Sequence, residues 1–133
     1  SVYGSYLVAC YDADTETYEA VCRVGGGLSD LQLEEFTLKL SKQTIETPKS
    51  YYNVGGCDKM DVWFDEQMVW ELKAADFSKS PKYSAAHTWL DDTDGQGISL
   101  RFPRFIRWRE DKKCEDCTSS EQMYDLYHSQ VNI

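Results

Sequence analysis

Alternating apolar and polar positions predict a β-rich first part of the chain. The run from Tyr3 to Tyr11 consists almost entirely of strand-forming residues, and residues 12–17 are polar turn material. From Tyr18 to Val24 every second residue is apolar, which is typical of a strand with one face toward a core. The two runs therefore predict an antiparallel hairpin with a loop of medium length.

A helix is predicted directly after the glycines at positions 25–27. Ser29 is a favourable N-cap residue, and Gln32, three positions later, completes a capping box. Leu33, Phe36 and Leu40 then recur at helical spacing, so the helix is expected to continue to about residue 42.

A second capping box predicts a C-terminal helix from about Ser119, with Thr118 as its N-cap residue and Glu121 as the reciprocal partner. Its apolar stripe consists of Met123, Leu126 and Tyr127.

Two further strands are expected in the second half of the chain. Residues 68–75 place Trp70, Leu72 and Ala74 on one face, and residues 98–108 form the longest strand candidate. Pro103 lies inside that candidate, and because proline cannot donate a ladder hydrogen bond, this point must be an edge or a bulge. About five strands with an inserted helix and a C-terminal helix predict one mainly β domain over residues 1–133. A small antiparallel barrel of the OB-fold fits, and other small barrels and α+β sandwiches fit the periodicity almost as well.

Composition excludes several classes of protein. The 133 residues carry a formal charge of −9, so any contact with phosphate must be made by a local patch. The five cysteines are an odd number without a framework, which favours reduced thiols and an intracellular location. Cys114 and Cys117 form a single CxxC pair and residues 91–97 lack the spacing of a calcium loop, so no metal site is expected. No apolar run is long enough to cross a bilayer.

One local patch stands out within this acidic chain. Residues 101–113 contain six cations and two carboxylates, with aromatic residues between them. Counted in steps of two, Ile98, Leu100, Phe102, Ile106 and Trp108 share one face, and Ser99, Arg101, Phe105, Arg107 and Arg109 share the other. Guanidinium groups spaced along a strand suit phosphate oxygens, which they can bind bidentately. The alternative is a solvated basic strand that pairs with the protein's own acidic surface.

The same segment, GISLRFPRFIRWREDKK, closely resembles the one that contains the last nucleotidyltransferase motif of eukaryotic replicative-type ATP-dependent DNA ligases. The blocks VYGSYLVACYD, GGGLSDLQLEE, VWELKAADFSKSP and TSSEQMYDLY occur in the order found in the C-terminal domain of that family. The resemblance implies an OB-fold and a part of an enzyme that seals nicks in duplex DNA. It also implies a nuclear location, ATP and Mg²⁺ as cofactors of the full-length enzyme with none expected on this chain alone, and a monomeric isolated domain.

The resemblance also assigns roles to residues of the patch. The last motif, which in this family orients the β and γ phosphates of ATP while the adenylation domain of the same chain becomes AMP-linked, falls on Arg107, Arg109, Asp111 and Lys112. Contact with the minor groove near the nick falls on Arg101, Phe102 and Arg104. A DNA-facing Phe102 conflicts with the period of two, and a bulge at Pro103 would re-aim this side chain outward.

One departure from the complete enzyme keeps other interpretations open. The ligase nucleophile lies in a Lys-x-Asp-Gly motif, but the only Lys-x-Asp here is Lys59-Met60-Asp61, followed by Val62, so we expect this chain alone to be inactive and to be one module of a longer protein. The alternatives are the OB domain of an mRNA capping guanylyltransferase and a non-enzymatic single-strand-binding OB module. The latter would favour a basic groove with exposed aromatics.

Overall fold

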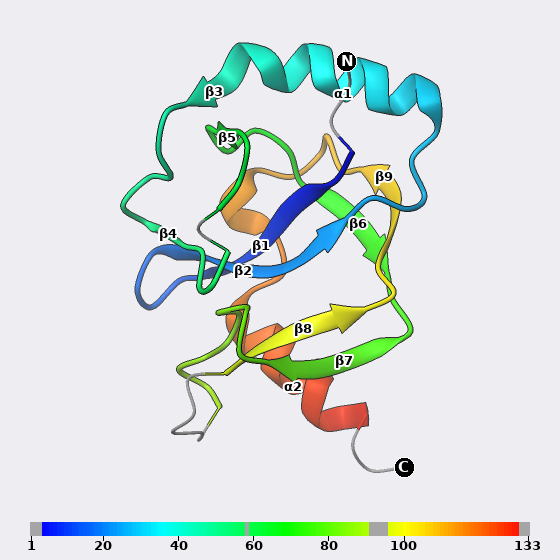
Figure 1. Ribbon diagram of the computed structural model, residues 1–133. Helices are drawn as coiled ribbons and strands as arrows, with labels where there is room; N and C mark the ends of the chain where they lie inside the picture. The colour runs from blue at the N-terminus through cyan, green and yellow to red at the C-terminus, as the bar shows by residue number, and fades with distance from the viewer. Residues whose placement is uncertain (1–3, 58, 91–95, 131–133) are drawn as a thin grey trace.

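A computed structural model describes residues 4–57, 59–90 and 96–130 (Figure 1). Short strands dominate these residues, together with two α-helices and 3-10 helices at Ser41–Gln43 and Cys114–Asp116. The elements are β1 (Tyr6–Asp12), β2 (Thr17–Val24), α1 (Asp30–Leu40), β3 (Thr44–Ile45), β4 (Tyr52–Asn53), β5 (Trp63–Phe64), β6 (Trp70–Lys73), β7 (Asp76–Ser80), β8 (Gly97–Arg101), β9 (Arg104–Trp108) and α2 (Ser120–Gln130).

The strands form several small sheets. Their orders are β1-β2-β4, β3-β5, β6-β9 and β7-β8, and all pairs are antiparallel except β2 with β4. In Figure 1, α1 lies above the β6–β9 pair and α2 lies beside β7 and β8 at the other end of the molecule. The mainly β class and the two helices are confirmed, and the arrangement is consistent with an OB-like domain, although the sheets of the described residues do not close into a barrel.

The first hairpin and the first helix follow the sequence prediction. β1 pairs antiparallel with β2. The capping box of α1 is present: the Gln32 N–H donates to Ser29 Oγ at 3.1 Å, and the Ser29 N–H donates to Gln32 Oε1 at 3.0 Å. These two bonds satisfy donors that a helix start would otherwise leave unpaired.

The second capping box lies one residue later than predicted. The Gln122 N–H donates to Ser119 Oγ at 3.1 Å, and the Ser119 N–H donates to Gln122 Oε1 at 2.9 Å. Thr118 was therefore the wrong N-cap residue. Its carbonyl accepts a hydrogen bond from the Tyr11 N–H at 3.2 Å, which keeps Thr118 alongside β1 and leaves the start of α2 to Ser119.

The predicted strand over residues 98–108 is two strands with different partners. β8 pairs with β7, and β9 pairs with β6. Phe102 and Pro103 lie between them, and Phe102 has φ 54°, a left-handed backbone conformation that is uncommon for a bulky residue. The chain therefore passes from one sheet to the next at the position where the proline predicted an irregularity.

A bulge in β9 determines which side chains face the core. Leu72 lies opposite Phe105 and Glu71 lies opposite Arg107, so Ile106 is an extra residue in the ladder. Such an insertion changes the face on which the following residues lie. Phe105 is buried and Ile106 is 46% exposed. The prediction that placed Ile106 in the core and Phe105 beside the arginines was therefore wrong.

Aromatic rings hold α1 against β6 and β9. The ring centroids of Trp70 and Phe105 are 4.8 Å apart, and Phe36 of α1 lies 5.5 Å from each of them. Trp108 contacts Phe36 edge-on at 6.1 Å. Large aromatic side chains contribute much of the apolar area that a small domain buries, so this cluster fixes the orientation of the β6–β9 pair.

A buried carboxylate joins three separate segments at the other end of the molecule. Glu19 is 1% exposed, and its Oε1 accepts hydrogen bonds from the Ser120 hydroxyl at 2.5 Å and the Ala86 N–H at 3.0 Å. Nε2 of His87 lies 3.0 Å from its Oε2. Burial raises the pKa of Glu19, while these partners satisfy its oxygen atoms. The network anchors the first residue of α2 to β2.

Cys10 of β1 and Cys22 of β2 are buried core residues. The segment 91–97, which lacks the spacing of a calcium loop, lies mostly outside the described residues. None of the helices described here is long and apolar enough to cross a membrane.

The contact between Gly27 and Phe105 gives a test of the β9 position. Gly27 has φ +88°, and a Cβ atom there would lie 2.4 Å from the Phe105 carbonyl oxygen. We expect Gly27→Ala to lower the free energy of unfolding by at least about 2 kcal/mol, because it adds backbone strain to a clash with backbone. At the neighbouring Gly26 the nearest atom would be 3.7 Å away. Chemical denaturation should show Gly26→Ala within about 0.5 kcal/mol of the parent; equal effects would contradict this packing.

Candidate functional site

The β6–β9 pair has an apolar, largely aromatic inner surface and a charged outer surface. Trp70 and Leu72 face the core together with Phe105 and Trp108. Their neighbours in the ladder face outward because successive side chains of a strand alternate. These outward residues are Glu71, Lys73, Arg104 and Arg107.

Glu71 holds both arginines of the predicted phosphate motif. Nε of Arg107 donates to Glu71 Oε1 at 3.1 Å, and Nη1 of Arg109 lies 3.6 Å from the same oxygen. Arg109 also forms a two-pronged pair with Asp111, through Nε to Oδ1 at 2.9 Å and Nη2 to Oδ2 at 2.8 Å. The Arg109 guanidinium lowers the pKa of Asp111 to about 2, and the same pair raises the pKa of Arg109.

Lys112 completes this group through a turn. Its backbone N–H donates to the Arg109 carbonyl at 3.3 Å, so the chain doubles back after β9. The Lys112 side chain is exposed and forms no ion pair with another described residue. The structure therefore brings Arg107, Arg109, Asp111 and Lys112 together at one end of β9, and Lys112 is the cation of this group that is not held by a carboxylate.

The residues predicted to contact DNA lie at the other end of β9. Phe102 is 75% exposed, as the resemblance implied and the period of two did not. The Arg101 guanidinium lies 5.7 Å from the Phe102 ring centroid, and its Nε donates to Asp76 Oδ1 at 2.7 Å. The outward direction comes from the break at Phe102, whereas the bulge itself lies at Ile106. Arg104 is exposed at the first position of β9.

Three of the arginines are thus paired with carboxylates of their own chain. The exposed side-chain fractions are 55% for Arg101, 61% for Arg107 and 25% for Arg109. Such ion pairs are also expected under the alternative that the basic strand is solvated and pairs with the protein's own acidic surface. Exposed pairs contribute only about 0.2–1 kcal/mol each, and a guanidinium has further N–H donors that can bind phosphate oxygens, so these pairs do not exclude an anionic ligand.

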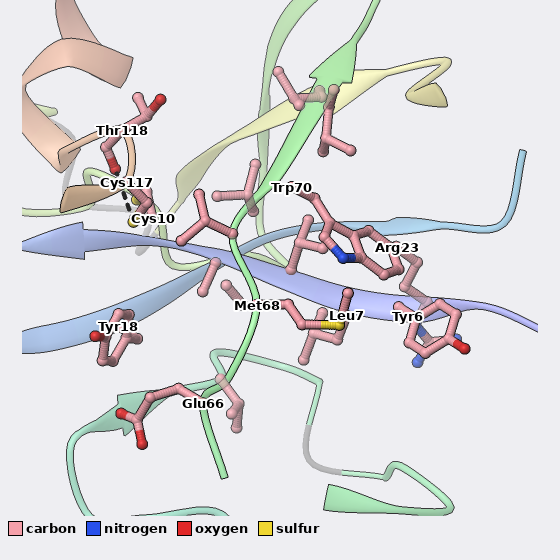
Figure 2. Close-up of a pocket in the computed structure, with 18 of the residues that line it drawn as sticks. Tyr6, Leu7, Cys10, Tyr18, Arg23, Glu66, Met68, Trp70, Cys117 and Thr118 are labelled. Atoms are coloured by element: carbon pink, nitrogen blue, oxygen red, sulfur yellow. Dashed lines mark hydrogen bonds between the residues drawn. The ribbon is translucent and has the colours of Figure 1, made fainter. Parts of the chain in front are cut away.

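A large cavity adjoins this group but has a different character. It has a volume of about 1020 Å³ and lies between β1 and the segment that leads into β6. Figure 2 shows Tyr6, Leu7, Met68 and Trp70 around it, and Arg109 and Lys112 contribute to its lining. Apolar walls do not suit a polyphosphate. The exposed basic group at the end of β9 is therefore the better candidate for binding one.

Sequence reasoning missed Glu71. The residue is 36 positions from Arg107 in the chain, so their contact follows from the pairing of β6 with β9 and is invisible in the local sequence. The alternation of Trp70 and Leu72 was a signal that Glu71 points outward. The identity of the strand beside β9 was missing.

The fold is that of a mainly β, OB-like domain with guanidinium groups held along an exposed strand. A family model described as the C-terminal region of ATP-dependent DNA ligases matches residues 1–112. The chain belongs to this family and corresponds to that region.

Curated relatives agree with this assignment. A DNA ligase 1 of Arabidopsis thaliana is 54% identical over 129 residues, which is 97% of this chain and 16% of that protein. A DNA ligase 1 of Schizosaccharomyces pombe is 47% identical, covering 98% of this chain and 17% of that protein. A DNA ligase of Hyperthermus butylicus is 39% identical, covering 97% of this chain and 21% of that protein. The chain thus spans about a fifth or less of the length of these relatives.

The ion pair between Arg109 and Asp111 can be tested by titration. We expect the Asp111 side-chain carboxyl to titrate with a pKa of about 2, followed by NMR of its carboxyl carbon. In Arg109→Ala the pKa should rise toward the ordinary value of 3.8, because the cation that stabilises the charged form is gone. Any stability from this exposed pair is present above pH 4 and is lost as the pH falls toward 2. An unchanged pKa in Arg109→Ala would contradict the pairing.

Proposed function

We propose that, in a DNA ligase carrying this chain, the group at the end of β9 grips the β and γ phosphates of ATP while the enzyme becomes adenylated. Arg107, Arg109 and Lys112 would contact the phosphates, and Asp111 would hold the Arg109 guanidinium. The observation that supports this assignment is the grouping of these four residues at one end of β9 and in the turn that follows it, with Arg109 fixed by two hydrogen bonds to Asp111.

The chemistry of adenylation needs such a group. A lysine of the adenylation domain attacks the α phosphorus of ATP, a P–N bond forms, and the bond to the bridging oxygen breaks as pyrophosphate leaves with its electron pair. Negative charge accumulates on the leaving pyrophosphate, and fixed cations stabilise the transition state electrostatically. In this proposal the chain supplies cations, and its partner is the adenylation domain, which supplies the nucleophile.

The proposal gives this chain phosphate contacts and no metal ligands. We expect Mg²⁺ to accompany ATP in the full-length enzyme. Among the described residues, no group of three or more His, Cys, Asp or Glu side chains is arranged to hold a metal ion, and the motif carboxylate, Asp111, is committed to Arg109. The described residues thus suit a polyphosphate and do not form a site for a resident cation.

We further propose that the opposite end of β9 binds nicked duplex DNA in the minor groove. Arg101 and Arg104 would contact backbone phosphates, and Phe102 would press its ring into the groove. Exposed apolar wedges flanked by cations are used in this way by minor-groove proteins. Support comes from the 75% exposure of Phe102, which would otherwise be an unfavourable position for a large ring. The nucleus is the compartment that this role implies.

The phosphate assignment predicts a step-specific defect. In a ligase carrying this chain, we expect Arg109→Ala to slow self-adenylation with ATP about 100-fold, because a fixed charge on the leaving group is lost. Sealing of a nick that already carries AMP should continue at close to the parental rate, since no pyrophosphate leaves in that step. Lys42→Ala, which removes an exposed cation outside the motif, is the control. Adenylation of Arg109→Ala within threefold of the parent would contradict the role.

The DNA assignment predicts a loss of affinity without a loss of stability. We expect Phe102→Ala to weaken binding to nicked duplex about tenfold, since aromatic contacts with nucleic acid contribute about 1–3 kcal/mol. Arg101→Ala should reduce the slope of log affinity against log salt concentration by about 0.9. Leu31→Ala is a matched control because Leu31 is 72% exposed on α1. Fluorescence anisotropy measures both quantities, and parental affinity of Phe102→Ala would refute the contact.

A further inference from the structure

We propose that Glu71 is a positioning residue for adenylation, which holds Arg107 and Arg109 in the orientation that receives the phosphates of ATP. This inference rests on the function proposed for the arginines. It adds a residue from a different strand that lies outside the sequence motif. Glu71 would act through the two guanidinium groups and would not contact ATP itself.

The contact with Arg107 leaves the phosphate-binding edge of that arginine available. Arg107 donates through Nε to Glu71 Oε1 at 3.1 Å, and this is the one hydrogen bond that its side chain makes to another described residue. A guanidinium has five N–H donors in a fixed planar arrangement. Holding it by Nε therefore fixes the plane near the strand while the terminal Nη1 and Nη2 groups, which suit phosphate oxygens, remain unengaged.

Glu71 also relates the two arginines to each other. Arg109 gives Nε and Nη2 to Asp111, and its remaining nitrogen, Nη1, lies 3.6 Å from the Glu71 oxygen that Arg107 contacts. One carboxylate oxygen thus lies between two cations that would otherwise repel each other. Arginine side chains lose rotamer freedom when they are ordered, so a shared partner reduces the cost of ordering both when a ligand arrives.

The backbone fixes where this carboxylate lies. Glu71 is directly opposite Arg107 in the β6–β9 ladder, and the adjacent Trp70 is packed against Phe36 and Phe105. Arg109 is tied to the same strand region because its N–H donates to the Val69 carbonyl at 2.7 Å. Glu71 therefore presents its charge from a rigid element, which is the requirement for orienting a catalytic group.

If the role of Glu71 were purely structural, its replacement would have little effect on adenylation. The side chain of Glu71 is 40% exposed, and exposed ion pairs contribute little to stability. A double-mutant cycle separates the two roles, because residues that act as a unit give non-additive effects. The variants are Glu71→Gln, Arg107→Ala and the two combined, each in a ligase carrying this chain.

The quantity to measure is the single-turnover rate of self-adenylation at saturating ATP. We expect Glu71→Gln to lower it about tenfold in the parent, within the range that misplacement of a catalytic group can cause, and at most threefold when residue 107 is already alanine. Glu71→Asp should recover part of the rate. Glu110→Gln removes a carboxylate from the same segment that forms no ion pair with another described residue, and its rate should stay within twofold of the parent. Sealing of an adenylated nick should be near parental in Glu71→Gln.

The possible outcomes distinguish this inference from the function on which it rests. An equal loss in both backgrounds, or no loss in either, overturns the role of Glu71 while a slow Arg107→Ala leaves the phosphate role of the arginines intact. If Arg107→Ala and Arg109→Ala both adenylate like the parent, the proposed function and the inference fail together. A fall in the sealing of adenylated nicks equal to the fall in adenylation would indicate general damage and would also overturn the inference.

Discussion

The pairing of β9 with β6 determines both the core and the charged surface of this domain. The inward side chains of the pair, among them Trp70 and Phe105, form the aromatic cluster beneath α1. The outward ones include Glu71 and Arg107. Because alternate residues of a strand face opposite sides, a slip of one position would exchange the two sets. It would bury an arginine, which is costly without a partner. The packing that stabilises the fold therefore also fixes the direction of the guanidinium groups.

The bulge at Ile106 is the second constraint on this surface. Without the extra residue, Phe105 and Arg107 would face the same side of the sheet, and the ring and the charge could not both have suitable surroundings. With it, Phe105 is buried and the Arg107 side chain is 61% exposed. Ile106 itself is left partly exposed. The exposure of one apolar side chain is a small cost compared with burial of an unpaired guanidinium.

The local sequence was sufficient for elements whose signals lie within a few residues. The Ser29 capping box, the first hairpin and the irregularity near Pro103 were all readable in this way. The register of β9 was not, because an insertion such as Ile106 is defined only by the partner strand. The start of α2 was misplaced because Thr118 and Ser119 are both suitable N-cap residues, and the choice depends on a hydrogen bond to Tyr11, more than 100 positions away. The four residues of the phosphate motif were grouped through the resemblance to the ligase family. Periodicity alone would have placed Phe102 in the core.

The basic segment is divided between the β7–β8 and β6–β9 sheets. Under the proposed function, this division gives one small domain separate groups of cations for two ligands. Arg101 belongs to the β7–β8 pair and is held by Asp76, whereas Arg107 belongs to β6–β9 and is held by Glu71. About 10 Å of strand separates Arg104 from Arg107, and the turn at Phe102 gives the two sheets different directions. Under the proposed function, a rigid-body rotation of the domain could present one group to ATP and the other to DNA without refolding. In a chain with a formal charge of −9, such local and separately oriented cations are what allow contact with an anionic ligand, since the overall field of the domain is repulsive.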